Sequence, residues 1–183
     1  MDTWKEFLSY LVGNFDNRQQ WEEKKSEDFP FAKHVNTLVT DKIQQLPEEK
    51  MAFLLEENTY LLQGKTKTSA HLFQFIPIRE NKIKMYSYRL PKGTDGKVIK
   101  TVATFPNVNY CELQKSSQFE EAIFERTDES HWTTHSVSQT GKDRYFVLTE
   151  CFTLNQLQVD EKIYSHEKLI FGFSEPILYD RQI

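Results

Sequence analysis

A long succession of short β-like segments is the feature that most constrains the fold of this chain. After Pro30 no strong helical periodicity returns, and short apolar segments alternate with turn residues such as Gly64 and Gly141. Sequential strands joined by tight turns predict an antiparallel meander, and closing the meander into an up-and-down barrel removes its exposed edges. We place the strands at 34–42, 52–62, 69–78, 82–90, 98–104, 119–126, 131–139, 144–152, 156–164 and 168–179.

An amphipathic helix is expected before these strands. Apolar residues from Trp4 to Phe15 recur at helical spacing, with Asp2 or Thr3 as the N-cap, and a second helical stretch follows before Pro30. We predict one domain over 1–183, with a helical segment over 1–25 and a barrel over 31–183. The expected fold is all-β: a lipocalin-like (calycin) antiparallel up-and-down β-barrel of about ten strands with an N-terminal α-helix.

Composition and charge exclude several classes of function. Lys and Arg total 23 against 27 Asp and Glu, with no basic block, so we expect no nucleic-acid partner. The first residues do not resemble a signal peptide and no apolar run is long enough to span a bilayer, which predicts a cytoplasmic protein.

Cys111 and Cys151 are expected to be free thiols. His131 and His135 share a strand face without a third ligand at diagnostic spacing, so we predict no metal site.

The alternation within the strands predicts a pocket. In the strands at 69–78 and 82–90 neither face is wholly polar. Polar groups such as Gln74, Tyr88 and Arg89 must therefore lie among aromatic side chains, which is typical of an apolar pocket with a few orienting groups.

Two adjacent carboxylates, Glu56 and Glu57, lie at the centre of the apolar stretch 51–62. Successive side chains of a strand point to opposite faces, so in a closed sheet one of the two faces the interior. An ionised carboxylate buried there needs a partner or a ligand. The alternation alone leaves open which glutamate it is.

Several stretches resemble, in the right order along nearly the whole chain, the CpeT/CpcT-type chromophore lyases. These proteins help attach open-chain tetrapyrroles (bilins) to cysteines of phycobiliproteins. One departure is the sequence T-S-A-H-L-F at 68–73, where the family carries two arginines that could pair with bilin propionates. The similar stretches are F-L-S-Y-L-V-G-N-F-D-N-R-Q-Q at 7–20, F-A-K-H-V at 31–35, E-N-T-Y at 57–60, K-I-K-M-Y-S-Y at 82–88, N-Y-C at 109–111, L-Q-V-D at 157–160 and I-F-G-F-S-E-P-I-L-Y at 170–179.

This resemblance implies a lipocalin-like barrel, commonly dimeric, that acts as a bilin lyase. The implied partners are phycocyanobilin or phycoerythrobilin, bound as substrate with no other cofactor, and a phycobiliprotein subunit. The E-N-T-Y match selects Glu57, which with Asp160 would pair with the pyrrole nitrogens and relay a proton. His71 would bind a propionate or act as an acid or base. The other expected ligand contacts are Tyr60, Phe73, Tyr88 and Arg89.

Two alternatives belong to other classes of protein. The missing arginines favour a non-catalytic, lipocalin-like binding protein for a tetrapyrrole or another apolar ligand such as haem or a fatty acid. A barrel with a packed interior would serve only as an interaction surface.

Overall fold

The computed structural model describes residues 2–24, 28–93, 95–117, 119–128 and 130–183. Two short helices, α1 (Thr3–Leu11) and α2 (Arg18–Lys24), accompany the 3-10 turns η1 (Thr40–Lys42), η2 (Val102–Thr104) and η3 (Tyr110–Glu112). The strands are β1 (Gly13–Asp16), β2 (Phe31–Leu38), β3 (Ile43–Gln44), β4 (Ala52–Leu62), β5 (Lys65–Arg79), β6 (Lys82–Tyr88), β7 (Val108–Asn109), β8 (Ala122–Arg126), β9 (Trp132–Gly141), β10 (Arg144–Phe152), β11 (Gln156–Ser165), β12 (Lys168–Phe171) and β13 (Ile177–Gln182).

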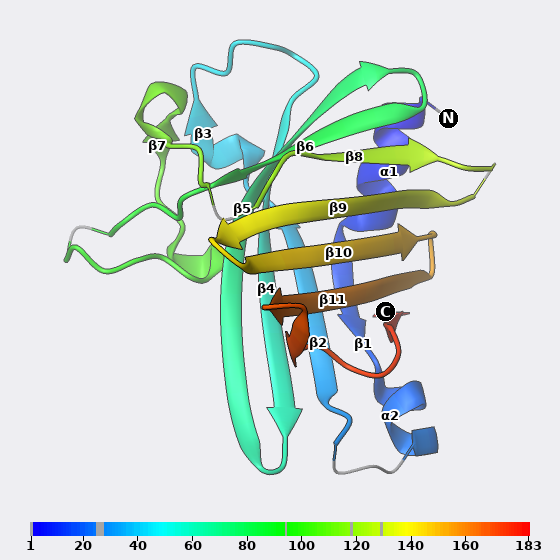
Figure 1. Cartoon of the computed structure of the whole chain (residues 1–183). Coiled ribbons are helices and arrows are strands. Elements are labelled where there is room, and N and C mark those ends of the chain that lie inside the picture. Colours follow the sequence, from blue (N-terminus) through cyan, green and yellow to red (C-terminus); the bar gives the residue numbers. More distant parts are fainter. Residues whose placement is uncertain (1, 25–27, 94, 118, 129) are drawn as a thin grey trace.

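The strands close into a barrel (Figure 1). Eleven strands form one sheet in the order β10-β9-β8-β6-β5-β4-β2-β1-β13-β11-β12, and a further β10–β11 pairing closes the ring. Ten antiparallel strands make up this ring, with β12 attached to β11 at one rim. Closure gives each ring strand a paired neighbour on both sides. The prediction of a lipocalin-like antiparallel barrel is confirmed.

Helix α1 fills one end of the barrel and lies behind β8–β10 in Figure 1. Phe7 is fully buried and packs edge-on against Phe124, Trp132 and Phe152, with ring centroids 5.0–5.5 Å apart. The Glu6 carboxylate accepts two 2.9 Å hydrogen bonds from the Arg126 guanidinium and one from the Trp132 indole. The amphipathic stripe thus serves as a plug whose apolar face completes the core.

A second apolar layer covers the outside of β4, β5 and β6. Phe53, Leu55, Leu72 and Tyr88 point outward from these strands and pack with Phe105 and its neighbours in a separate buried cluster. The strands therefore have two apolar faces, one toward the interior and one under this layer. That is why neither face of β5 or β6 is wholly polar, and why Tyr88 and Gln74 bond to each other outside the barrel.

Several predicted elements differ in the structure, including the first predicted strand, 34–42, which is β2 (Phe31–Leu38) followed by η1. Helix α1 ends at Leu11 and a strand, β1, follows within the predicted helical segment, of which Met1 and Lys25 lie outside the described residues. Gly13 permits this turn, because a Cβ there would lie 2.2 Å from the Arg181 guanidinium that caps the last carbonyls of α1. The stretch 98–104 is not a strand but leads into η2, and 168–179 divides into β12 and β13 around Gly172, whose φ is +137°.

Candidate functional site

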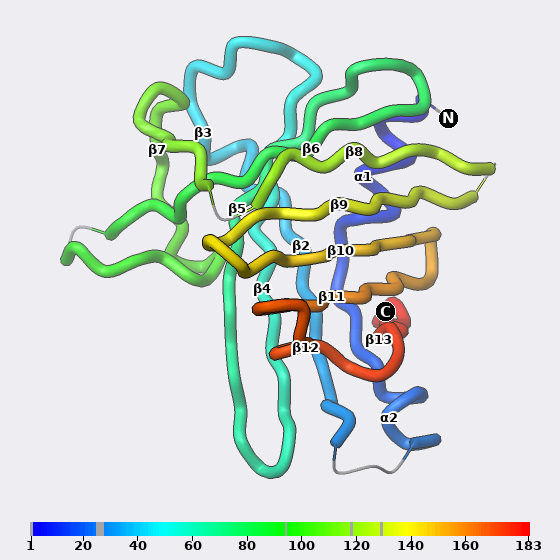
Figure 2. The backbone as a smooth tube through the Cα atoms, viewed as in Figure 1, coloured from blue at the N-terminus to red at the C-terminus, as the bar shows by residue number. Residues whose placement is uncertain are grey.

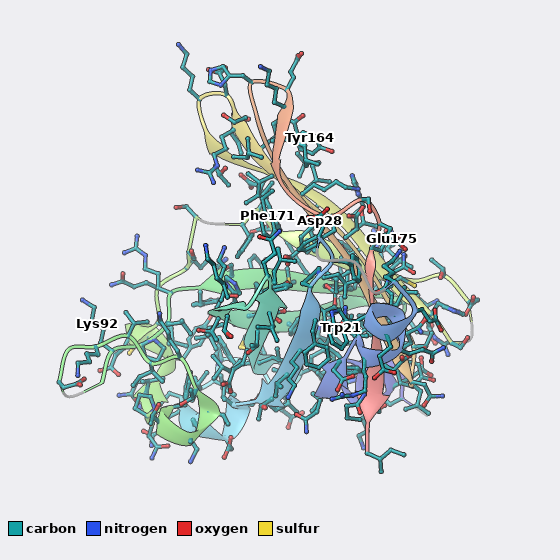
Figure 3. All side chains as sticks on the ribbon, turned by 90° about the horizontal axis from the view of Figure 1, so that it is seen from below. Trp21, Asp28, Lys92, Tyr164, Phe171 and Glu175 are labelled. Atoms are coloured by element: carbon teal, nitrogen blue, oxygen red, sulfur yellow. The ribbon has the colours of Figure 1, made fainter. Side chains whose placement is uncertain are left out.

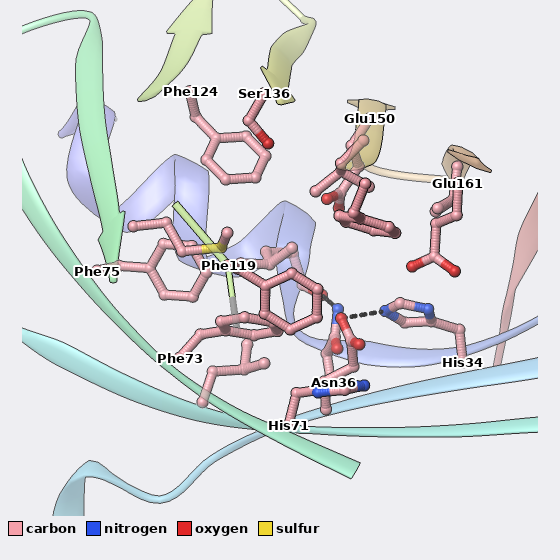
Figure 4. A pocket seen from close by; sticks show the side chains of 17 residues that line it. His34, Asn36, His71, Phe73, Phe75, Phe119, Phe124, Ser136, Glu150 and Glu161 are labelled. Atoms are coloured by element: carbon pink, nitrogen blue, oxygen red, sulfur yellow. Dashed lines mark hydrogen bonds and ion pairs between the residues drawn. The ribbon is translucent and has the colours of Figure 1, made fainter. Parts of the chain in front are cut away.

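The barrel encloses a small cavity with an apolar wall and a polar wall (Figure 4). The space open to the centre of a water molecule is about 40 Å³, enough for roughly three waters at ~10–15 Å³ each. Aromatic and aliphatic side chains from β5, β8 and β10 form the apolar wall. The titratable and amide side chains of the polar wall come from β2, β4, β5, β10 and β11: His34, Asn36, Glu56, His71, Glu150 and Glu161.

Glu56 and His34 form a buried ion pair on this polar wall. The Nε2 atom of His34 lies 3.3 Å from Oε2 of Glu56, and the Asn58 amide donates a 2.7 Å hydrogen bond to Oε1. Burial alone would raise the pKa of Glu56, but the His34 charge and these contacts outweigh it and hold the pKa at about 2. The same pairing outweighs the burial of His34 and raises its pKa.

Glu150 and Glu161 have the opposite electrostatic character. Burial raises the pKa of Glu150 to about 8 against the lowering effect of the His34 charge, and the negative charges of Glu56 and Glu161 add to the rise. Burial and the charge of Glu56 raise the pKa of Glu161 to about 7. The Tyr60 hydroxyl donates a long, 3.5 Å hydrogen bond to Glu161. Both carboxyls therefore carry protons through much of the neutral range.

Two buried amide oxygens at the polar wall have no donor. They are Oδ1 of Asn36, which lines the cavity, and Oδ1 of Asn58, whose amide bonds to Glu56 beside it; within the described residues neither oxygen has a hydrogen-bond partner, and Nε2 of His34 has only its ion pair with Glu56. The amide nitrogens of Asn36 and Asn58 are already used, on the Leu11 carbonyl and on Glu56. Each unpaired buried group costs about 1–3 kcal/mol. A ligand rich in N–H donors would supply what this wall lacks.

A wider cleft opens next to the cavity, between residues of the long β4–β5 hairpin and residues of the arm formed by β9, β10 and β11. Figure 2 shows the backbone of these two segments. The cleft's space for water centres is about 330 Å³. Figure 3 shows Tyr164 on the projecting arm and Phe171 at the arm's base. We call this space the mouth cleft; it is lined by Tyr60, Lys67, Ser69, His71, Phe119, Thr140, Arg144, Phe146, Glu161, Ile163 and Phe171.

The mouth cleft and the interior cavity share one partition. His71, Phe119, Phe146 and Glu161 line both spaces. The Phe119 ring lies 5.1 Å from that of Phe146 and 5.3 Å from that of His71, centroid to centroid. A ligand entering from the cleft therefore meets this aromatic partition before it reaches the polar wall.

The prediction that Glu57 faces the interior was wrong. Glu57 lies on the outer face of β4, where its carboxylate accepts a 3.1 Å hydrogen bond from the Val102 backbone, and Glu56 lines the cavity instead. Asp160 shows the same slip by one residue: it pairs with Lys162 at 2.7 Å on the outer side of β11, while the adjacent Glu161 faces the cavity. Two carboxylates do face inward from these strands, each one position away from the predicted residue.

The other predicted residues divide between the site and the surface. His71 and Phe73 line the cavity with their rings stacked 5.9 Å apart, and Tyr60 lines the mouth cleft. Tyr88 lies in the outer apolar layer. Arg89 is exposed and contacts Gln114, so neither reaches the site.

Sequence reasoning assigned no role to His34, Asn36, Glu150, Glu161 and Tyr179. For Glu150 a signal existed, because it continues the inward set Phe146 and Leu148 at period two. His34, Asn36, Glu161 and Tyr179 could be assigned to the site only after it was known which face of each strand points inward.

Both cysteines are free thiols, as predicted. Among the described residues, no group of three or more His, Cys, Asp and Glu side chains is placed to hold a metal ion. None of the helices in the described part of the chain has the length and apolar character to cross a membrane.

Comparisons with known proteins bear on the fold. No family model matches the chain, and no curated protein sequence matches it. Among solved structures, the T-type phycobiliprotein lyase CpeT from Prochlorococcus phage P-HM1 aligns over 100% of both chains, with a TM-score of 0.59 and 9% sequence identity. The resemblance inferred from the sequence motifs is thus supported at the level of the fold: this chain has the barrel architecture of a T-type phycobiliprotein lyase.

Proposed function

We propose that this protein binds an open-chain tetrapyrrole and assists its covalent attachment to a cysteine of a phycobiliprotein subunit. The observation that carries the proposal is the acceptor-rich polar wall, on a barrel that shares its fold with a phycobiliprotein lyase. A bilin carries pyrrole N–H groups and becomes cationic on protonation. Carboxylates and amide oxygens without donors are the groups that such a ligand would satisfy.

The two spaces suggest where the bilin would lie. The interior cavity is too small for a tetrapyrrole, whereas the mouth cleft, at about 330 Å³, is in the range of small-molecule sites. We place most of the ring system in the cleft, against Phe171, with its inner end displacing the Phe119 ring of the partition so that the pyrrole nitrogens reach the polar wall. Glu161, which lines both spaces, would then face the pyrrole nitrogens.

Glu161 is the residue we assign to proton transfer. Addition of a thiol to a bilin ethylidene group forms a carbon–sulfur bond, and the proton lost by the thiol is matched by one gained by the bilin. No oxidant or reductant is consumed. Its pKa of about 7 lets Glu161 hold a proton and release it near neutral pH, as general acid–base catalysis requires. Glu56, ionised beside His34, would stabilise positive charge on the tetrapyrrole.

The first prediction tests this assignment by absorption spectroscopy. Mixing the protein with phycocyanobilin is expected to shift and intensify the long-wavelength band, because the bilin becomes fixed in one conformation. Glu161→Gln and Glu56→Gln should each weaken bilin binding about tenfold, since each removes a charge-assisted hydrogen bond. Glu57→Gln, on the outer face of the same strand as Glu56, is the matched control and should bind like the wild type. An unchanged bilin spectrum with wild-type protein would refute the proposal.

A non-catalytic tetrapyrrole-binding protein is the second candidate, favoured by the absence of the two arginines at 68–73. Incubation with phycocyanobilin and a phycobiliprotein subunit, followed by mass spectrometry of the subunit, separates the two functions. A lyase raises the yield of the correct cysteine adduct above the spontaneous level. A binding protein retains the bilin without doing so. The open cleft and the cavity count against the third alternative, a packed barrel without a ligand site.

A further inference from the structure

We propose that Lys67 and Arg144 form a carboxylate-binding site at the mouth cleft, so that the cleft selects apolar ligands with an acidic arm. This inference deepens the proposed function and rests on it only in taking a bilin, through its propionates, as one such ligand.

The two cations approach the mouth cleft from its two sides. Lys67 belongs to the β4–β5 hairpin and Arg144 opens β10 on the projecting arm, and both side chains line the cleft. In the part of the chain that the structure describes, neither forms an ion pair. Other cations of the barrel are neutralised by carboxylates, as Lys82 is by Glu125 and Lys162 by Asp160. The mouth cleft therefore concentrates two positive charges that no described carboxylate holds in an ion pair, although Lys67 acts at longer range on Glu161 in the same cleft.

The rest of the cleft wall is suited to an apolar body. Phe119, Phe146, Ile163 and Phe171 are the apolar side chains that line it. The ammonium of Lys67 lies 5.3 Å from the centroid of the Phe171 ring, a cation–π contact that holds the charge at the edge of this apolar surface. An acidic arm bound there would leave the ligand's body on the aromatic side chains.

The opposed charges of the two spaces fix the direction of the ligand. The deep end presents the carboxyl oxygens of Glu161 and, beyond the partition, the ionised Glu56; the charge of Glu56 repels a carboxylate, and both groups accept hydrogen bonds from N–H donors. The outer end presents Lys67 and Arg144. A guanidinium offers two parallel N–H groups to one carboxylate, so Arg144 can bind an acidic arm in bidentate fashion. A ligand with donors at one end and an acid at the other therefore enters donor end first.

The test uses a matched pair of probes that owe nothing to bilin chemistry. Parinaric acid is a fluorescent apolar carboxylate, and its methyl ester has the same body without the charge. We expect the wild type to bind the acid more tightly than the ester, by roughly three- to tenfold for a partly exposed charge contact. Added salt should narrow this difference, because ions screen exposed charges. No fluorescence response to the acid, or equal affinity for acid and ester, overturns the inference.

Two charge-removing variants locate the effect. Lys67→Gln and Arg144→Gln should each weaken binding of the acid about threefold or more and leave binding of the ester unchanged. Lys65→Gln and Lys142→Gln are the matched controls, since they lie on the same hairpins but do not line the cleft. If the two cleft variants bind the acid like the wild type, or lose acid and ester equally, the positive charges are not the determinant and the inference fails.

The same variants distinguish failure of this inference from failure of the proposed function. If the acid depends on Lys67 and Arg144 but phycocyanobilin produces no spectral change, the carboxylate site stands and the bilin function falls. If bilin binds equally as free acid and as dimethyl ester, and neither variant affects it or parinaric acid, the carboxylate site falls and the bilin function stands.

Discussion

At the scale of single residues, three carboxyl groups in one cavity have different protonation states because only Glu56 lies within ion-pair distance of a cation. Glu56 lies against His34 and keeps its charge, with a pKa of about 2. Glu150 and Glu161 are buried without such a partner, and the charge of Glu56 adds to their burial in raising their pKa values to about 8 and about 7. The cavity therefore combines a fixed negative charge with carboxyl groups that can exchange a proton near neutral pH.

The shift at Glu150 gives a prediction for stability. A carboxyl whose pKa rises from 4.5 in the unfolded chain to about 8 in the folded one holds its proton more tightly when folded. The free energy of unfolding should therefore fall as the pH rises from about 5 to 8. His34, whose folded pKa is also raised, and Glu161 contribute in the same direction.

Glu150→Gln should reduce this loss by about 2 kcal/mol, because the amide cannot ionise. Urea unfolding at pH 5.5 and pH 8 measures the effect. Glu57→Gln, on the outer face of β4, should keep the wild-type dependence on pH. A Glu150→Gln variant with the full wild-type loss of stability would show that Glu150 ionises in the folded protein as readily as in the unfolded chain.

Which residues of β4 and β11 face inward was predicted wrongly from the sequence, for a physical reason. The bounds of β4 were predicted correctly, but Ala52 to Leu55 are buried on both faces, so the strand carries no polar alternation that sets its phase. The motif match then favoured Glu57, so every position on β4 that was predicted to face inward is shifted by one residue from the position that does. Asp160 failed likewise, since its neighbour Glu161 is equally acidic. His71 and Phe73 do line the cavity, and their spacing of two places them on one face of β5, but β5 is also buried on both faces over residues 72–75, so its sequence alone does not show which face is inward.

At the scale of elements, α1 and the barrel depend on each other. A helix of nine residues is too short to be stable alone, and here it is held by Phe7 in the core and by the Glu6–Arg126 pair. The helix in turn closes one end of the barrel. The sequence predicted this helix from its periodicity, but not its early end at Leu11, which depends on the contact between Arg181 and the carbonyls of residues 10 and 12.

Truncation of the plug gives a second stability prediction. Phe7→Ala should destabilise the protein by about 3–5 kcal/mol, because it removes a fully buried ring and leaves a cavity among Phe124, Trp132 and Phe152. Leu8→Ala, on the same helix but only partly buried, should cost clearly less. Chemical denaturation of both variants measures the difference. Equal losses would mean that α1 stabilises the barrel through its surface and not through the buried ring.

At the scale of the whole molecule, closure of the barrel and access to its interior are opposed requirements. The ring of ten strands buries the polar wall, and the hairpin β4–β5 and the arm β9–β11 extend beyond the ring to form the mouth cleft at its side. Of the residues shared by the two spaces, Phe119 lies outside the strands, on the connection that leads into β8. Its side chain is therefore the part of the partition that can change without altering a strand.

Removal of this ring should join the two spaces. We expect Phe119→Ala to increase the association rate of phycocyanobilin or parinaric acid several-fold in stopped-flow measurements, since the ligand no longer has to displace the ring. Phe171→Ala is the control: this ring lines the mouth cleft but not the interior cavity, so its loss should weaken binding by removing apolar contact without raising the association rate. Unchanged association by Phe119→Ala would mean that ligands bind in the outer cleft without passing the partition, and that Glu161 acts on them from its rim.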